Sequence, residues 1–473
     1  MRQFPKWWFI IAFALISAEG ITQKSDTKAM LGEQESLSRD IFKELIEINT
    51  TVSKGSTRAA EAMAARLRSA GFPEKDVSLA GPHPMHMNLV ARYRGNGTLS
   101  PILFIGHLDV VEAYREDWSF DPFKFIESDG YFYGRGTTDM KSDDASLIVN
   151  LIHLKKEGFV PDRDIIVALT EDEEGGNANG IKWLLNNRRD LIDAEYCINP
   201  DGGGGDIKNG KEIVMNIQTS EKVYFDFSIE AHNKGGHSSL PVKDNAIYRL
   251  AEALTRLGKY DFPIRLNETT RAYFQRNATT ESGQIKADML AVAAIPADTA
   301  AAIRLAALSP YYNSLMRTTC VATILRGGHA ENALPQTAIA NINCRMLPDD
   351  NPENVLSTLK YIINDPQIKI NITDSSIAGP LSPLRINLVD AVDKLTADMW
   401  PGVIVVPSMT TGASDGKFLR RAGIPVYGIS GMFGDIDDTR AHGKDERMGV
   451  KEFYKGVEFM YRLMKALSSR TGI

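Results

Sequence analysis

Hydrophobic and polar residues follow two patterns along this chain, and the first predicts a domain of alternating helices and strands. From about residue 38, SRDIFKELIEI and STRAAEAMAARLRSAGF repeat apolar residues three and four positions apart, as amphipathic helices do. The runs PILFIG, DIIVALT and AEYCIN are almost wholly apolar, which is typical of strands buried on both faces. Because the helical stretch SDDASLIVNLIHLKKEG separates the first two, the pattern predicts an α/β fold with a mostly parallel sheet flanked by helices.

The second pattern begins near residue 221 and predicts an inserted α+β lid domain at residues 221–376. KVYFDFSIEAH and TAIANINCRMLP alternate apolar with polar residues, as strands with one solvated face do, and DNAIYRLAEALTRL reads as a helix. Residues 259–318 are assigned only as a partly helical extension of this insert. The first pattern returns in VIVVPS, KFLRRAG, IPVYGIS and EFYKGVEFMYRLMKAL, so residues 35–220 and 377–473 form the two parts of the larger domain.

The N-terminus, residues 1–20, has the features of a secretory signal peptide. Arg2 and Lys6 precede the apolar run WWFIIAFALISA, and small residues at Ala18 and Gly20 offer a cleavage site. The run is shorter than the ~20 residues that a membrane-spanning helix needs. We therefore expect an exported protein, periplasmic or secreted, with no membrane span after cleavage.

Composition narrows the kinds of site that this chain can hold. The 54 Lys and Arg residues against 60 Asp and Glu residues give a net charge of −6, which disfavours nucleic acid as a partner. The three cysteines, Cys197, Cys320 and Cys344, include no CxxC pair and leave at least one thiol unpaired. We therefore expect neither a disulfide framework nor a zinc site with cysteine ligands. Any metal must be held by histidine and carboxylate side chains.

Five such side chains stand just after predicted strands or in glycine-rich loops between elements: His107, Asp139, Glu174, Asp201 and His442. The ends of parallel strands meet at one edge of a sheet, so these loops should converge. Two imidazoles and three carboxylates suit zinc, with Mn²⁺ or Co²⁺ as substitutes. Asp109 lies two residues after His107, on the same side of an extended segment, so its carboxylate can orient the imidazole.

Other histidines, and one lysine next to a predicted ligand loop, give weaker evidence for a functional role. His153 reads as a helix residue at the margin of the core. Four others fit no ligand pattern: His83, His86, His232 and His329. Lys141, in TDMKSD, has no chemical duty beyond balancing the charge of nearby carboxylates.

Six motifs in order, from about residue 38 to 470, make the chain resemble a known enzyme family. They are GHLDVV, WSFDPF with DGYFYGRGTTDMKSD, DEEGG, the Asp201 loop, GGHSS and HGKDER. The chain resembles the di-zinc metallopeptidases that include carboxypeptidase S, bacterial glutamate carboxypeptidase, aminoacylase-one and succinyl-diaminopimelate desuccinylase. The resemblance implies that His107 and Asp201 hold one Zn²⁺, that Glu174 and His442 hold the other, and that Asp139 bridges them. It also implies that Glu173 is the general base.

The same resemblance assigns roles to residues of the insert and to one late glycine. His237, in GGHSS, would donate a hydrogen bond to the oxyanion of the transition state, usually from a partner subunit. Asn332, Arg345 and Gly412 would bind the substrate carboxylate. Aspartate at position 201 and the long insert match the carboxypeptidase S branch. A homodimer would supply His237 from the second subunit, whereas a monomer would need closure of its own lid.

These residues predict a metal-dependent hydrolase of an amide bond next to a free carboxylate. The substrate would be a small peptide, for a carboxypeptidase or dipeptidase, or an N-acyl amino acid, for a deacylase. One alternative is a serine hydrolase, because Gly412–Gly416 fits G-x-S-x-G with Ser414 as nucleophile, and Asp437 and His442 follow. Only 28 residues separate Ser414 from His442, which is short for that fold. The other alternative is a non-catalytic periplasmic binding protein, in which Glu173 would have no use.

Overall fold

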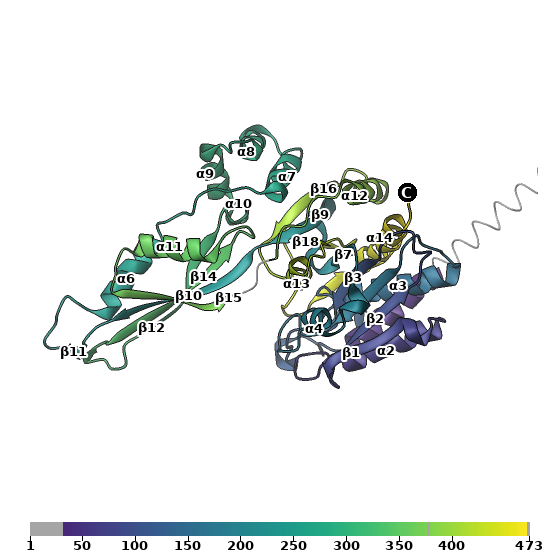
Figure 1. Ribbon diagram of the computed structural model, residues 1–473, viewed down its shortest axis with the longest axis horizontal. Helices are drawn as coiled ribbons and strands as arrows, with labels where there is room; N and C mark the ends of the chain where they lie inside the picture. Colours follow the sequence, from purple (N-terminus) through teal and green to yellow (C-terminus); the bar gives the residue numbers. More distant parts are fainter. Residues whose placement is uncertain (1–31, 376–378, 471–473) are drawn as a thin grey trace, which may run out of the picture.

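A computed structural model describes residues 32–375 and 379–470, so the predicted signal peptide at residues 1–20 lies outside the described residues. The described chain forms a larger part, which contains the main sheet, and a second part that extends to one side and carries strands β10, β12, β14 and β15 (Figure 1). Across these two described stretches, no helix combines the length and the apolar character needed to span a membrane.

The larger part is built on a six-stranded sheet with the order β1-β2-β6-β3-β7-β17. Strands β6, β3, β7 and β17 run parallel to one another, as the apolar runs predicted. Strands β1 and β2 form an antiparallel hairpin at one edge, because two residues are too few for a parallel crossover. The strands are β1 (Val77–His83), β2 (His86–Tyr93), β3 (Ile102–His107), β6 (Ile165–Thr170), β7 (Tyr196–Ile198) and β17 (Val426–Tyr427).

Helices cover both faces of this sheet, which confirms the α/β fold class. On β3, Phe104 packs into the core shared with helix 32–47, α2, α3 and α14, whereas Ile105 packs against α4 and α13 on the opposite face. Burial on both faces is the physical reason why these strands lack polar residues. The helices are 32–47, α2 (Thr57–Ser69), α3 (Lys141–Glu157), α4 (Gly180–Asn187), α5 (Arg189–Ile192), α13 (Gly416–Arg421) and α14 (Val450–Ser468).

A second sheet, with the order β16-β9-β8-β18, connects the larger part to the insert. The run VIVVPS forms β16, which pairs with the long strand β9 instead of joining the main sheet. Strand β9 continues almost directly into β10 of the insert, so one extended stretch of chain crosses between the two parts (Figure 1). The elements are β8 (Gly204–Lys208), β9 (Lys211–Glu221), β16 (Ile404–Thr410), β18 (Phe433–Asp435) and the neighbouring helix α12 (Ile386–Met399).

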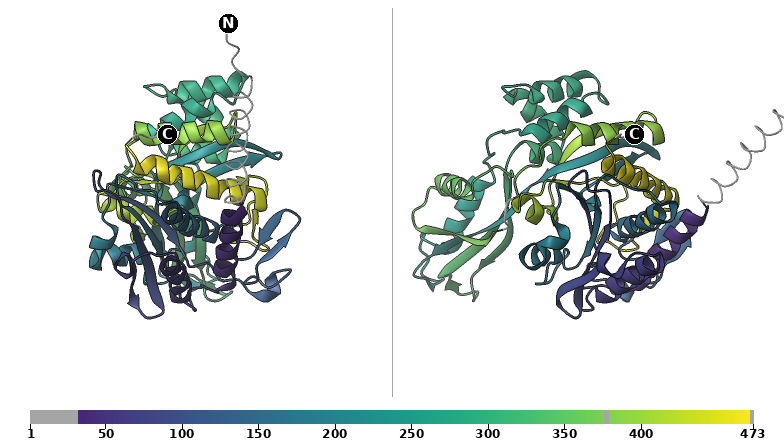
Figure 2. Two further views of the ribbon diagram at one scale, coloured as in Figure 1. Left: turned by 90° about the vertical axis from the view of Figure 1, so that its right-hand side faces the viewer. Right: turned by 45° about the vertical axis from the view of Figure 1, so that its right-hand side comes forward.

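The insert contains a four-stranded antiparallel sheet with the order β12-β14-β10-β15. The apolar positions predicted for β10 and β14 are buried, and α6 and α11 cover them, so the polar positions face away from these helices. Figure 2 shows this sheet and its helices standing apart from the main sheet. The elements are β10 (Val223–His232), β12 (Thr319–Gly327), β14 (Thr337–Met346), β15 (Ile368–Ser375), α6 (Ala246–Leu257) and α11 (Pro352–Ile363).

Residues 259–318, which the sequence left largely unassigned, form four short helices. Their apolar core includes Phe274 and Leu315 together with Val406 and Met409 of β16, so they pack on the second sheet and not on the sheet of the insert. The helices are α7 (Glu268–Asn277), α8 (Gly283–Ala293), α9 (Thr299–Leu308) and α10 (Pro310–Met316).

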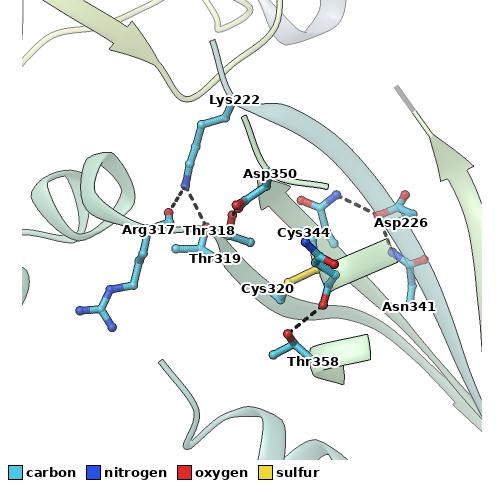
Figure 3. The surroundings of a disulfide bond; sticks show 12 residues. Lys222, Asp226, Arg317, Thr318, Thr319, Cys320, Asn341, Cys344, Asp350 and Thr358 are labelled. Atoms are coloured by element: carbon cyan, nitrogen blue, oxygen red, sulfur yellow. Dashed lines mark hydrogen bonds between the residues drawn. A yellow bond between two sulfur atoms is a disulfide. The ribbon is translucent and has the colours of Figure 1, made fainter. Parts of the chain in front are cut away.

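The three cysteines form one disulfide and leave one free thiol, so the chain has a single crosslink and no disulfide framework. Cys320 on β12 and Cys344 on β14 lie directly opposite each other and are bonded (Figure 3). Cys197 is free and buried. The two positions are 24 residues apart in sequence, and only the register between the strands brings them together.

Candidate metal centre and active site

Three of the five predicted metal ligands lie at the carboxyl ends of the parallel strands. His107 is the last residue of β3, Glu174 follows β6, and Asp201 lies in a short 3₁₀ turn after β7. Asp139 and His442 come from two loops that flank the paired strands β5 (Tyr131–Tyr133) and β19 (Arg447–Gly449), which form a small sheet with β4 (Ile126–Ser128). The pairing of β5 with β19 sets these two loops side by side.

Asp139 is the centre of this cluster because each of its carboxylate oxygens contacts a different histidine. His107 Nε2 lies 3.0 Å from Asp139 Oδ1, and His442 Nε2 lies 3.1 Å from Asp139 Oδ2. His442 Nε2 also lies 2.7 Å from Glu174 Oε1. Asp201 is an electrostatic neighbour of His107, Asp139 and Glu174. The structure therefore brings His107, Asp139, Glu174 and His442 into contact, and Asp201 lies close enough to interact electrostatically with three of them.

The electrostatics of the cluster are those of carboxylates crowded around two imidazoles. Burial opposes ionisation of Asp139, but the hydrogen bonds from both histidines lower its pKa below the ordinary value. The hydrogen bond to Asp139 raises the pKa of His442 to about 9. Burial raises the pKa of Asp201 to about 7, with the nearby carboxylates adding to the effect. Protons on the imidazoles thus supply positive charge that a bound cation would supply in their place.

Asp109 supports the site differently from the expectation. The Nδ1 atom of His107 lies 3.0 Å from the backbone oxygen of Asp109 and 3.8 Å from its carboxylate, so the carbonyl orients the imidazole. The carboxylate instead accepts hydrogen bonds from the backbone N–H groups of Glu173 and Glu174, at 3.2 and 3.0 Å. Asp109 therefore ties the loop after β3 to the loop after β6.

Glu173 lies beside the cluster with its carboxyl group in a polar but largely enclosed setting. Burial raises its pKa well above the ordinary value, and Asp201, Asp415 and Glu174 raise it further, while His107 lowers it. Asp415 is held by Asn179, whose Nδ2 donates to Asp415 Oδ1 at 2.6 Å. A carboxyl group whose pKa is raised in this way holds a proton more readily than a solvated carboxyl group, as a group that transfers protons must.

Two further residues, Glu446 and Arg135, hold the cluster together. The buried carboxylate of Glu446 accepts hydrogen bonds from Arg135 Nη1 at 2.6 Å, Gly136 N at 3.1 Å, Thr138 N at 2.7 Å and Asp139 N at 3.2 Å. Arg135 Nη2 donates to the backbone oxygens of His442 and Gly443 at 3.3 and 3.2 Å. The pair thereby fixes both the Asp139 loop and the His442 loop. Arg135 lies in the motif GRGTTDMK and Glu446 in HGKDER. The two are 311 positions apart, so their spacing in the sequence could not predict that they form a pair.

Lys141 and His86, to which the sequence analysis gave no specific role, both form hydrogen bonds in the structure. The fully buried Lys141 donates to the backbone oxygens of Leu45 and Ile48, both at 2.9 Å, so it anchors the end of helix 32–47 as well as neighbouring buried carboxylates. His86, which fitted no ligand pattern, lies on β2 with its Nδ1 2.7 Å from Glu171 Oε2. The antiparallel pairing of β2 with β6 makes this contact across 85 residues.

The residues predicted to bind substrate fall into two groups. Arg345 lies near Gly412, because its Nη1 donates to the backbone oxygen of Thr411 at 3.4 Å, and its guanidinium stacks over Tyr224. His237 and Asn332 lie together elsewhere, at the exposed β11 (Gly236–His237) and β13 (Ala333–Leu334) ribbon. That ribbon is at the far tip of the insert, remote from β3 in the same chain (Figure 1).

The serine-hydrolase alternative does not fit the geometry. Ser414 is 3% exposed, and its hydroxyl accepts hydrogen bonds from Gly416 N at 3.2 Å and Asn199 Nδ2 at 3.4 Å. In that alternative His442 would have to accept the proton of Ser414, but its Nε2 faces Asp139 and Glu174 instead. Ser414 therefore belongs to the structural core of its loop.

A cleft of about 1260 Å³ lies near the metal-ligand cluster, although none of the five predicted ligands is part of its wall. Its wall includes Thr138, Gly202 and Ala441, each adjacent in sequence to one of the predicted ligands. At its other end the wall includes Tyr273 and Tyr311 of helices α7 and α10. The four-helix segment thus forms part of the wall of this cleft.

A shared carboxylate between two imidazoles, with a second glutamate beside them at the end of a parallel strand of an α/β chain, is the arrangement of a metal-dependent hydrolase. The chain belongs to peptidase family M20/M25/M40, whose model matches residues 103–466. This match confirms the resemblance to the di-zinc metallopeptidases and excludes a serine hydrolase.

Curated relatives and a solved structure agree with the family. The chain is 28% identical to the probable carboxypeptidase S-like 2 of Dictyostelium discoideum, over 80% of this chain and 74% of that protein. It is 28% identical to the N-fatty-acyl-amino acid synthase/hydrolase PM20D1 of Homo sapiens, over 78% and 74%. The fold resembles the crystal structure of the M20 metallo-carboxypeptidase Sso-CP2 from Sulfolobus solfataricus, with a TM-score of 0.65, 18% identity and coverage of 90% and 98%. The chain is thus a hydrolase of the peptidase and aminoacylase type.

Proposed function

We propose that this protein hydrolyses the amide bond of an N-acyl amino acid, or of the C-terminal residue of a small peptide. The observation that carries the proposal is the position of Asp139, which contacts His107 through one carboxylate oxygen and His442 through the other. A carboxylate placed between two imidazoles in this way suits a pair of cations that share it.

The donor set fits two divalent cations, zinc in first place and Mn²⁺ or Co²⁺ as substitutes. His107 and Asp201 would hold one cation, Glu174 and His442 the other, and Asp139 both. Support comes from the excess of buried carboxyl groups over imidazoles, which leaves the cluster short of positive charge. When bound, two such cations lower the pKa of water and polarise the carbonyl of the scissile amide.

Glu173 acts as the general base and then as the general acid. It accepts a proton from the water that attacks the amide carbon, and it delivers that proton to the amine nitrogen as the carbon–nitrogen bond breaks. Its neighbour Glu174 has an oxygen engaged by His442, so it is the less suitable of the two for proton transfer. The raised pKa of Glu173 supports both halves of this role.

The carboxylate of the substrate binds to Arg345 and to the loop at Gly412. A guanidinium can bind a carboxylate through two parallel hydrogen bonds. Arg345 donates to the backbone oxygen of Thr411 through Nη1, and a guanidinium has further N–H groups that can donate to the substrate. The N–H of Gly412 lies 3.3 Å from Thr410 Oγ1 and would exchange that partner for the substrate. His237 and Asn332 would reach a site from the lid of a partner subunit, so we propose a homodimer.

The acyl side of the substrate occupies the cleft beside the cluster. Its wall combines backbone near Gly202 with the rings of Tyr273, Tyr311 and Tyr312, which suits an acyl group larger than a single small side chain. The curated relative PM20D1 carries N-fatty-acyl-amino acid in its name, which supports an N-acyl amino acid over a dipeptide.

Export of the protein is part of the same proposal. The apolar run that follows Arg2 and Lys6 supports a cleaved signal peptide. The bond between Cys320 and Cys344 would persist in an oxidising compartment, which supports a periplasmic or secreted location.

The test is a panel of N-acyl amino acids and dipeptides incubated with zinc-loaded protein, with release of free amino acid as the readout. We expect release from at least one N-acyl amino acid, and loss of that release in the presence of a chelator. Glu173→Gln should keep its metal content and lose turnover by about 10²–10⁴-fold. The exposed Glu112, changed to Gln, is the matched control and should keep turnover. No release from any substrate, or an active Glu173→Gln protein, would refute the proposal.

A further inference from the structure

A second group of potential metal ligands lies beside the active site, on the edge of the main sheet. His86 on β2 meets Glu171 and Asp172, which directly follow β6. One ligand atom from each side chain lies within 4.8 Å of the other two. The group shares no side chain with the cluster around Asp139, and nothing assigned above uses it.

The spacing of these atoms suits a cation with tetrahedral coordination. The Nδ1 of His86 lies 2.7 Å from Glu171 Oε2 and 3.8 Å from Asp172 Oδ1. Ligands at ~2.0–2.2 Å from a tetrahedral zinc ion are separated by roughly 3.4 Å, a value between these two distances. Small side-chain rotations would therefore bring the three atoms into position.

Two buried oxygens in this region have no hydrogen-bond partner among the described residues. Glu171 is fully buried, and its Oε1 has no hydrogen-bond partner among the described residues. The hydroxyl of Ser56 is also buried and lacks a partner in the described chain, and the backbone N–H of Ser56 faces the Glu171 carboxylate. A hydrogen bond between His86 and Glu171 alone accounts for neither oxygen. Buried polar atoms are almost always paired in native proteins, so an unpaired carboxylate oxygen beside two other candidate ligands is a suitable position for one more partner.

The surroundings favour a positively charged ligand and leave it a route of entry. Asp109 and Asp172 both lie close enough to interact electrostatically with Glu171. The backbone N–H of Ala178 donates to Asp172 Oδ2 at 2.9 Å, whereas Asp172 Oδ1 is the oxygen that faces His86, at 3.8 Å from its Nδ1. Solvent reaches the group from the His86 side, because the His86 side chain is 21% exposed whereas that of Glu171 is 0% exposed. The exposed ring of His83 lies 5.9 Å from that of His86, between centroids.

We propose that His86, Glu171 and Asp172 form a third divalent-cation site, with one imidazole and two carboxylates as ligands and water completing the coordination. Zinc or manganese suits this donor set. The site adjoins the active site through Asp109, whose carboxylate holds the backbone of Glu173 and Glu174. A cation here would stabilise the loop after β6, which carries the general base and one ligand of the catalytic cluster.

The test counts bound metal by elemental analysis after the chelator-treated protein is dialysed against Zn²⁺. We expect three equivalents per chain in the wild type and two in both His86→Ala and Glu171→Gln. The second variant preserves side-chain volume, so a loss of zinc in it does not reflect a cavity. His153→Ala is the matched control, because His153 is also a partly buried histidine near a glutamate, 3.9 Å from Glu157, and it should keep three.

The outcomes separate this site from the proposed catalytic cluster. Only two equivalents in the wild type, with both of them lost in Asp139→Asn, would overturn the inference, as would a third equivalent that survives in both variants. If the catalytic cluster fails to bind zinc, the wild type would hold one equivalent and His86→Ala none, which supports this site while it contradicts the proposed function.

Discussion

Replacing Glu446 with Gln tests whether a buried carboxylate outside the ligand set holds the catalytic cluster in shape. Four N–H groups point at this carboxylate, two at each oxygen: Arg135 and Gly136 at Oε2, and Thr138 and Asp139 at Oε1. A glutamine has a single acceptor oxygen, and its other end is an NH₂ group that donates. In either orientation of the amide, two of the four donors would face another donor.

The magnitude follows from the bonds that are lost. Hydrogen bonds to a charged group contribute about 1.5–3 kcal/mol each, so the loss of two costs about 3–6 kcal/mol. Breaking a buried ion pair costs about 3–5 kcal/mol, and Arg135 loses its charged partner here, so we expect about 4 kcal/mol of destabilisation. The Asp139 loop would also shift, and changes to residues that orient ligands typically weaken metal binding by about 10–100-fold.

Two measurements check this prediction: urea unfolding of the metal-free protein, and titration of the folded protein with Zn²⁺. Glu127→Gln is the control, because Glu127 forms an exposed pair with Arg39 at 2.7 Å, and its loss should cost less than about 1 kcal/mol. If Glu446→Gln unfolds at the same urea concentration as the wild type and binds zinc equally well, then Glu446 does not organise the site and the reasoning is wrong.

Three further predictions concern other parts of the chain. Cys320→Ala should lower the free energy of unfolding by about 3 kcal/mol, given the 24-residue separation of the bonded cysteines, and reductant should have the same effect on the wild type in urea unfolding; equal stability would contradict this. Burial lowers the pKa of Lys222 from 10.5 to about 7, so the unfolded chain binds more protons between these values. The stability of the wild type relative to Lys222→Met should therefore rise from pH 7 to 10, and a flat difference would contradict the burial argument. Ser414→Ala should keep hydrolysis, whereas removal of a serine nucleophile costs on the order of 10⁶-fold in kcat.

Much of the fold could be predicted from the sequence, because the burial of a segment determines which of its positions are apolar. Strand β3 was recognisable since both of its faces are buried, and β14 because every second side chain is. The site residues were recognisable for a related reason: loops after parallel strands converge, and polar residues such as His107 and Asp201 stand where those strands end.

Other features were not predictable, because they depend on pairings between distant segments. The run VIVVPS reads as a buried strand, but nothing in it specifies β9 as its partner. Residues 259–318 form short helices. Their apolar side chains pack against one another and also against β16, which is far away in the sequence.

The sequence by itself thus indicated which segments are strands or helices and which side chains could hold a metal. Only the tertiary structure decided that Asp139 stands between two histidines, that Glu446 holds the Asp139 loop, that Cys320 meets Cys344, and that His86 meets Glu171. The physical reason is that hydrophobic periodicity reports the burial of one segment at a time, whereas strand order and register decide which segments become neighbours.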